Sequence, residues 1–347
     1  MGVGDLNLAI VLSAALTIIR FASGRTADFT SDVHAAAQPF TSAVASWNVR
    51  TPAGSWIQTR LRVRIAQGFT QWYDMGYWSR TTDGHHRHSV KPQYDADGSV
   101  DTDTLNLRSP ADAWQVQVLV HAGDDGELPV LSLVAITTNE SKTETQALSP
   151  ESRASPAWGR ELAVPERTQR VDESPDALAG GGDSWCSPTS VSMVMAYWAA
   201  TLHHPQWDVA VPKAARDTYD PVYDGCGNWP FNVAFASEHG LAGWVERLPT
   251  LAAMDRYLLA GIPLVASIRV KPGELAGSPY PKTDGHLLVV RGFTSTGDVI
   301  TNDPYALPGH IRIIYQREQF DHVWMGGSGG IVYVIAPPAL LNRFGRR

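Results

Sequence analysis

The spacing of apolar residues in this chain changes once, from the two-residue period of strands to the longer period of a helix. This change indicates two structural units. Between residues 30 and 140, apolar and polar side chains alternate in short runs. Such alternation is typical of strands that are buried on one face and solvated on the other. From residue 188 onward, helical spacing appears first and apolar strands follow. The first region, which contains only predicted strands, is expected to be an all-β unit. The second region, in which a helix precedes several strands, is expected to be a segregated α+β unit.

The first unit is expected to be a sandwich. The clearest alternation lies at 56–65 and 114–121, and 129–138 also has the character of a strand. Turn sequences such as Asp97-Gly98 and Asp124-Asp125-Gly126 separate the runs. Short strands with this punctuation predict an antiparallel sandwich or jelly roll over residues 1–140.

The apolar stretch Leu6–Ile19 resembles the core of a signal peptide, but its flank does not fit. Asp5 precedes it, and no Lys or Arg does, whereas secretory signals carry positive charge there. The stretch is also too short to cross a bilayer before Arg20. We therefore expect two strands, Leu8–Leu12 and Leu16–Phe21, and no membrane-spanning segment.

Residues 141–164 lose periodicity and are rich in Ser, Thr, Glu and Pro. Such a composition is typical of linkers that pack poorly, so we place a boundary there, before a second domain at 165–347. In that domain an apolar stripe predicts a helix at 188–199, and Thr250 is the expected N-cap of a second helix that ends at residue 260. Strands are predicted at 264–270, 287–293, 299–302, 311–315 and 331–335.

Charge and cysteine content exclude several functions. The net charge is −7, which argues against a nucleic-acid-binding surface. Two cysteines cannot form a four-cysteine zinc site. The segment Asp83–His88 is rich in histidine but lacks carboxylate or thiol partners at a recognised spacing, so a solvated turn is expected. No metal or cofactor is implied.

The segment Gly180–Ser190 carries the strongest chemical signal. A run of glycines delivers Cys186 to the first turn of the predicted helix. Unpaired N–H groups and the positive end of the helix dipole favour a thiolate there, and the thiolate is the nucleophile of covalent catalysis. The same N–H groups could stabilise an oxyanion. Taken alone, Cys186 fits equally well as a small buried hydrophobic residue.

A histidine and an aspartate follow at informative positions. His286 begins an apolar strand, and Asp303 closes the next one, 17 residues later (303 − 286 = 17). If 287–293 and 299–302 pair as a hairpin, the two side chains meet at its open end. A carboxylate beside Nδ1 of His286 would fix the tautomer and stabilise the imidazolium. The alternative role of Asp303 is to cap a turn before Pro304.

These motifs together resemble a known family. The sequence Trp185-Cys186-Ser187-Pro188-Thr189-Ser190 at a helix start, Gly285-His286 before an apolar strand, and Asn302-Asp303-Pro304 resemble the bacterial C-39-like peptidases. These are papain-fold relatives of the bacteriocin-leader-processing proteases, and the resemblance covers residues 165–340. It implies a papain-like α+β domain with Cys186 as nucleophile, His286 as general base and Asp303 as the acid that orients the base.

The resemblance also implies a peptide or protein substrate, no cofactor and an extracytoplasmic location, although no clear signal peptide is present and a cytoplasmic location stays open. Gln169 is similar to the oxyanion-hole glutamine of C-39-like domains, and a surface linker residue is the alternative. Trp185, Asn228 and Trp229 are candidate cleft residues. The last two belong to a glycine-flanked loop that feeds a short helix at 231–239, and a packing turn would explain this loop equally well.

The sequence therefore predicts a cysteine peptidase or amide hydrolase that works through a thioester acyl-enzyme. The alternatives are a catalytically inactive cell-surface binding protein on the same scaffold and an acyltransferase. Aromatic residues of the first domain could stack on a polymer or cell-surface ligand if they are exposed along one face, whereas burial would assign them to the core. They are Trp47, Trp56, Phe69, Trp72, Tyr73, Tyr77, Trp78 and Trp114.

Overall fold

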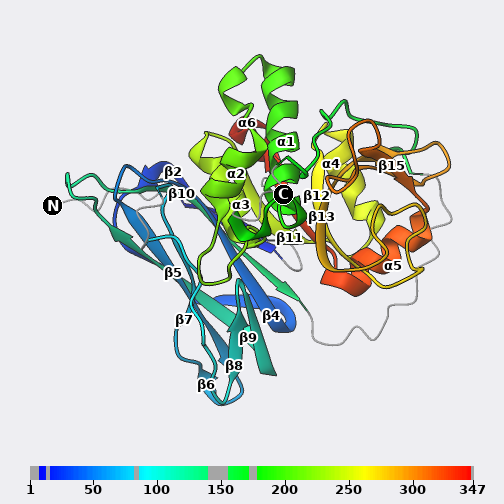
Figure 1. Cartoon of the computed structure of the whole chain (residues 1–347). Helices are drawn as coiled ribbons and strands as arrows, with labels where there is room; N and C mark the ends of the chain where they lie inside the picture. The colour runs from blue at the N-terminus through cyan, green and yellow to red at the C-terminus, as the bar shows by residue number, and fades with distance from the viewer. Residues whose placement is uncertain (1–7, 13–15, 82–85, 140–154, 172–177, 345–347) are drawn as a thin grey trace.

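The computed structural model describes residues 8–12, 16–81, 86–139, 155–171 and 178–344, and places in them two antiparallel sheets with helices packed beside and between them (Figure 1). The first sheet has the strand order β1-β2-β10-β4-β9-β5-β6, with β3 and β8 paired to β9 and β7 paired to β5. Its strands are β1 (Leu8–Leu12), β2 (Leu16–Arg25), β3 (Phe29–Thr30), β4 (His34–Arg50), β5 (Trp56–Ile65), β6 (Gly68–Phe69), β7 (Tyr73–Trp78), β8 (Gly98–Asp101), β9 (Thr104–His121) and β10 (Val130–Asn139).

The strands of this first part hydrogen bond as one continuous sheet. Strands β4 and β9 are long, with 17 and 18 residues, and each pairs with different neighbours along its length. The pairing of β4 with β9 shifts register near Phe40, where the strands are irregular. The sequence pattern predicted several of these strands, among them Leu8–Leu12, the beginning of β2, β5, the end of β9 and β10. It did not locate β4, the long strand that joins β10 to β9.

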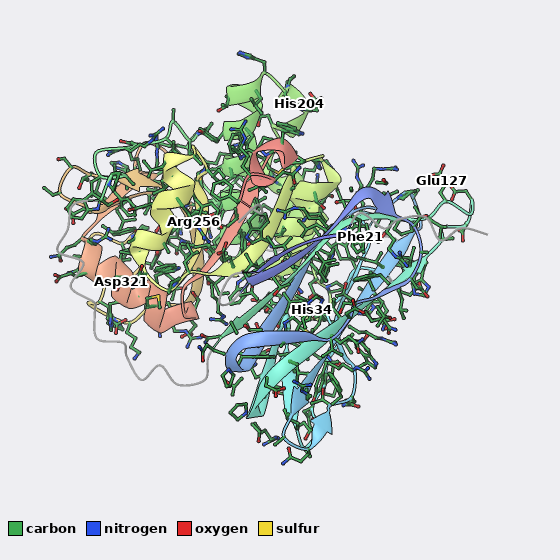
Figure 2. All side chains as sticks on the ribbon, turned by 180° about the vertical axis from the view of Figure 1, so that it is seen from behind. Phe21, His34, Glu127, His204, Arg256 and Asp321 are labelled. Atoms are coloured by element: carbon green, nitrogen blue, oxygen red, sulfur yellow. The ribbon has the colours of Figure 1, made fainter. Side chains whose placement is uncertain are left out.

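The second sheet has the order β11-β16-β12-β13-β14-β15, so that the described part of the chain is all-β first and α+β afterwards. The two ends of the molecule carry different elements: Figure 2 shows Phe21 and His34 on the first sheet, and Arg256 and Asp321 on the helices of the second half. The strands are β11 (Ala242–Arg247), β12 (Leu264–Val270), β13 (Thr283–Phe293), β14 (Val299–Asn302), β15 (Arg312–Tyr315) and β16 (Ile331–Ala336). The helices are α1 (Cys186–Leu202), α2 (Val211–Thr218), α3 (Trp229–Glu238), α4 (Asp255–Leu259), α5 (Arg317–Ser328) and α6 (Pro338–Leu341), with 3₁₀ turns at Leu178–Asp183, Pro205–Trp207 and Leu251–Met254.

Most boundaries of the second half agree with the sequence pattern, and the helix predicted at 250–260 does not. That segment is a 3₁₀ turn followed by α4, and Thr250 makes no side-chain capping hydrogen bond. Asp255 opens α4 instead and places a carboxylate in its first turn, where the helix dipole favours negative charge.

The two halves share one hydrophobic core. The ring of Phe231 on α3 lies 6.2 Å from that of Trp47 and 5.3 Å from that of Trp78, both on the first sheet. Gly76 opens the space for this contact, because a Cβ atom there would lie 3.1 Å from the Phe231 ring. Buried apolar residues continue from one half into the other without a break. Helix α3 and strand β11 thus cover a face that the first sheet would otherwise expose (Figure 1).

Buried polar contacts fix the same interface. The Glu238 carboxylate accepts hydrogen bonds from the Thr51 N–H and hydroxyl and from the Trp78 indole N–H. The Asn48 side chain makes two hydrogen bonds with the Gly243 backbone, at 2.7 and 3.0 Å. Since unpaired buried polar groups are costly, these pairs specify how the two halves dock.

Arg87 also connects the two halves, and its position corrects the prediction made for the segment Asp83–His88. Residues 82–85 lie outside the described residues, but Arg87 is buried and donates to the carbonyl oxygens of Arg216 and Tyr219 in the second half. The interpretation of Asp83–His88 as a solvated turn is therefore wrong for Arg87. Its guanidinium instead donates hydrogen bonds to the carbonyl groups at the end of helix α2.

The segment predicted as a linker, 141–164, divides into two parts. Residues 141–154 lie outside the described residues. Residues 155–164 run along strand β13: Trp158 and Glu161 form bridges with Phe293 and Gly292, and Leu162 is buried. This part of the segment adds apolar surface to the second half.

Aromatic side chains of the first sheet are largely used in packing. Trp47, Tyr73, Trp78 and Trp114 are buried. Trp56 stacks on His121 and His86, and Tyr77 stacks on His88. Of the eight aromatics considered, Phe69 is exposed, at 38%, and the others are buried or partly buried. No helix among the described residues has the length and hydropathy needed to cross a membrane.

Candidate active site

Helix α1 begins at Cys186 and is anchored to the second sheet by hydroxyl groups. The Ser187 hydroxyl hydrogen bonds with the Tyr333 hydroxyl at 2.9 Å, and the Ser190 hydroxyl donates to the Leu287 carbonyl at 3.0 Å. Both serines are fully buried. The polar residues in the first turns of an otherwise apolar helix thus have a local cause, because they hold its N-terminus beside the strand that carries His286.

Strands β13 and β14 form the predicted hairpin, and His286 meets Asp303 at its open end. Val289 pairs with Asn302 across the ladder. Nε2 of His286 lies 2.8 Å from Oδ1 of Asp303, with the histidine 4% and the aspartate 0% exposed. The expectation that the carboxylate lies beside Nδ1 is therefore wrong. Since Asp303 engages Nε2, Nδ1 is the ring nitrogen left for Cys186.

The charges of the three groups support one another. Burial raises the pKa of the Cys186 thiol, but the hydrogen bond and charge of His286 and the N–H groups of Leu287 and Ser187 outweigh it and leave the pKa below its ordinary value. Burial lowers the pKa of His286, yet Asp303 and Cys186 raise it to about 10. At neutral pH this arrangement favours a thiolate paired with an imidazolium.

Asp303 is surrounded by donors. Its Oδ1 atom also accepts the Tyr305 backbone N–H at 3.1 Å, and its Oδ2 atom accepts the hydroxyls of Tyr280 and Tyr315, each at 2.9 Å. Burial raises the pKa of Asp303, but the His286 charge and these hydrogen bonds hold it below its usual range. The turn-capping role that the sequence left open is also present, since Tyr305 follows Pro304.

Asn302 and Pro304 hold the Gln169 segment beside this site. The Asn302 amide donates to the carbonyls of Val164 and Pro165, and the Pro304 carbonyl accepts the Gln169 backbone N–H at 2.8 Å. Each residue of the Asn302-Asp303-Pro304 motif therefore has a separate structural task.

The Gln169 side chain is fully buried, so a surface linker position is excluded. Its Nε2 group donates to the carbonyl of Gly182, and Oε1 has no hydrogen-bond partner among the described residues. Gly182 permits this close approach because a Cβ atom there would lie 2.8 Å from the Gln169 carbonyl oxygen. The glycine-rich run before Cys186 thus packs directly on Gln169.

The candidate cleft residues occupy different environments. Trp185 is 2% exposed, and its indole N–H donates to the Leu178 carbonyl at 2.9 Å. Asn228 is fully buried and caps helix α3 by accepting the Phe231 N–H. The structure thus places Trp185 beneath the glycine run and uses the Asn228 side chain as a helix cap.

Trp229 is half-buried and joins the two halves near the site. Its backbone N–H donates to Oδ2 of Asp103, from the turn between β8 and β9, at 2.7 Å. Burial raises the pKa of Asp103 to about 6. A carboxylate of the first sheet therefore caps the helix that carries Trp229, a contact with no signal in the local sequence.

Sequence reasoning also missed Tyr223. Its ring lies on the glycines of the loop that precedes α3: a Cβ atom at Gly225 would lie 2.5 Å from the ring, and one at Gly227 would lie 3.3 Å from the hydroxyl. Burial raises the pKa of Tyr223, and so does the nearby Cys186 thiolate. Tyr223 is nevertheless 42% exposed, so the charge of Cys186 acts on an aromatic side chain that is accessible to solvent. Gly225 and Gly227 were the signal in the sequence, because two glycines so close together indicate that a bulky side chain packs against the backbone.

Within the described residues, no three His, Cys, Asp or Glu side chains gather as a metal-binding group. Two family models match the chain. Residues 19–139 match the Peptidase C39 N-terminal domain, and residues 161–329 match the Peptidase_C39 like family. No curated protein matches the sequence.

Proposed function

Because both parts of this chain match C39 peptidase families, the chain is a relative of the C39-like cysteine peptidases, and we propose that it hydrolyses peptide bonds with Cys186, His286 and Asp303. The family match supports a cysteine-peptidase type of function in general. The assignment of the three residues rests on their geometry. The arrangement is papain-like in this proposal: the nucleophile opens a helix, and the base and its orienting acid lie on the adjacent antiparallel sheet.

The proposed reaction has two stages. The Cys186 thiolate attacks the carbonyl carbon of the peptide bond, and the His286 imidazolium donates its proton to the leaving amine. The product amine departs, and the acyl group remains as a thioester on Cys186. Neutral His286 then takes a proton from water as the water oxygen attacks the thioester carbon, which releases the acid and restores the thiolate.

Negative charge on the carbonyl oxygen needs donors during both stages. At the start of α1 the backbone N–H of Cys186 is suited to this role, since Pro188 has no N–H and the Thr189 N–H already donates to the Trp185 carbonyl. We also propose Gln169. An amide side chain has two N–H bonds, of which one is held by Gly182, so that the second is available for the oxyanion.

One observation carries the proposal: the His286 ring is paired with the buried Asp303 carboxylate at 2.8 Å and lowers the pKa of Cys186, which opens a buried helix. A cysteine that served only for packing would not need an imidazole paired with a buried carboxylate. Ion-paired cysteines of this kind are the reactive ones.

The test is alkylation by iodoacetamide across pH, with the labelled cysteine identified by mass spectrometry. We expect Cys186 to react far below the ordinary thiol pKa of about 8.5, and His286→Ala to restore ordinary titration. His322→Ala is the matched control, because His322 is exposed and lies on α5. A Cys186 that is inert, or that titrates as a free thiol in the wild type, would refute the mechanism and leave a binding protein on the same scaffold.

Hydrolysis itself is measured on unfolded casein, with new amino termini detected by mass spectrometry and Cys186→Ala as the blank. For Gln169→Ala we expect a loss of kcat of about 10²–10³-fold while alkylation of Cys186 persists. Products that carry an added amine in place of a new carboxylate would identify an acyltransferase.

A further inference from the structure

We propose that Tyr280 and Tyr315 are positioning residues of this site, whose two hydroxyls hold Asp303 as a charged acceptor turned toward His286. The inference rests on the proposed function, and it concerns how the histidine obtains its orientation and charge. Neither tyrosine belongs to a motif recognised in the sequence.

The two oxygen atoms of the Asp303 carboxylate have different hydrogen-bond donors. Oδ1 of Asp303 accepts from His286 and from the Tyr305 backbone, whereas the donors to Oδ2 within the described residues are the hydroxyls of Tyr280 and Tyr315, at 2.9 Å each. With donors on both oxygens, rotation of the carboxyl group would break four hydrogen bonds. The oxygen that faces His286 is thereby fixed.

Burial makes the two hydroxyls necessary. Asp303 is 0% exposed, so no bulk water is available to solvate Oδ2. A buried carboxylate without donors takes up a proton, because desolvation favours its neutral form. The tyrosines remain donors at any working pH, since burial and the Asp303 charge raise the pKa of both.

The tyrosines come from separate elements that converge on one atom. Tyr280 belongs to the loop between β12 and β13, and Tyr315 ends β15. The Tyr280 ring also lies 4.8 Å from the His286 ring, so it limits the movement of the imidazole directly. The titratable groups facing Asp303 are thus His286, Tyr280 and Tyr315, with Cys186 beyond the histidine.

The effect on Cys186 follows from the charges. Without the hydroxyls Asp303 accepts a proton more readily, so a larger fraction is neutral at a given acid pH. The imidazolium then lacks its counter-charge, and the thiolate lacks the imidazolium. We expect the acid limb of Cys186 alkylation to move to higher pH.

The experiment measures alkylation rate against pH for Tyr280→Phe, Tyr315→Phe and the double variant, each of which removes an oxygen and keeps the ring. We expect the midpoint to rise by about one pH unit or more in the double variant and by less in each single one, which lowers the rate on the acid limb by about tenfold. Tyr257→Phe is the matched control. Tyr257 is a buried tyrosine that donates to the Glu246 carboxylate, away from Cys186.

A merely structural role predicts a different result. The variants would then melt at lower temperature, as Tyr257→Phe is expected to do, with the midpoint unchanged, and that outcome overturns the inference. The single variants decide the question if the double variant does not fold. If wild-type Cys186 already titrates as a free thiol, the proposed function fails instead, so the two failures are distinguishable.

Discussion

Replacing Arg87 by methionine tests the argument that the two halves fold as one unit. Arg87 is 5% exposed, and its guanidinium donates to four carbonyl oxygens: those of Ser79 and Arg80 in its own half, and those of Arg216 and Tyr219 across the interface, at 2.7–3.3 Å. It also lies 5.6 Å from the centre of the Trp78 ring. Methionine keeps most of the packing and removes every donor.

The expected loss can be worked from these contacts. Four hydrogen bonds at a net value of about 1 kcal/mol each give about 4 kcal/mol. Burial lowers the pKa of Arg87, which shows that the charged group pays a desolvation cost, and methionine recovers about 1 kcal/mol of it. The net loss is about 3 kcal/mol. At about 2 °C per kcal/mol for a chain of this size, Tm should fall by about 6 °C.

The assay is urea and thermal unfolding, followed by Trp fluorescence and far-UV circular dichroism together. The matched control is Arg64→Met, because Arg64 pairs with Asp112 at the exposed surface and such pairs contribute little. One transition at a lower midpoint for Arg87→Met supports the reasoning. An unfolding midpoint equal to that of the control would show that the interface does not depend on Arg87, and would refute it.

Two further predictions concern buried titratable groups. Burial raises the pKa of Asp103 from an ordinary 3.8 to about 6, so the folded state binds this proton more tightly and stability is lost as pH rises from about 4 through 6. Asp103→Asn should then be more stable than the wild type at pH 7.5, by up to about 3 kcal/mol, and equal to it near pH 4 in urea titrations; a constant difference across pH would contradict this. Cys226 is 1% exposed, and burial raises its pKa to about 12. Iodoacetamide should therefore label Cys186 alone in the native protein, and Cys226→Ser should leave the rate of Cys186 labelling unchanged. Labelling of Cys226 in the folded protein would contradict its burial.

The features that the sequence predicted well are those fixed by neighbours along the chain. The hairpin of β13 and β14 is closed by a short turn, so the approach of His286 to Asp303 could be inferred from spacing alone. The position of Cys186 at a helix start follows from the glycine run and Pro188. Alternation located β5 and the end of β9 in the first half, whereas β12, β14 and β16 were recognised as short apolar runs.

The features that the sequence did not reveal depend on contacts between distant segments. Tyr280 and Tyr315 carry no local pattern that marks a carboxylate between them, and Asp103 caps a helix more than a hundred residues away (229 − 103 = 126). The ring nitrogen that Asp303 engages depends on how the histidine side chain is turned. Arg87 appeared solvated because its acceptors are backbone carbonyls, which every residue has.

The shared core has a consequence for biosynthesis. Trp78 leaves the ribosome 153 residues before Phe231, the residue that covers it (231 − 78 = 153). At ordinary translation rates that interval is about 8–30 s, during which the nascent first sheet presents an uncovered apolar face. Cys186 is likewise made 117 residues before Asp303 (303 − 186 = 117). The sulfur therefore acquires its activating partners only after the cover for the first sheet has been synthesised, so that in this chain shielding precedes reactivity.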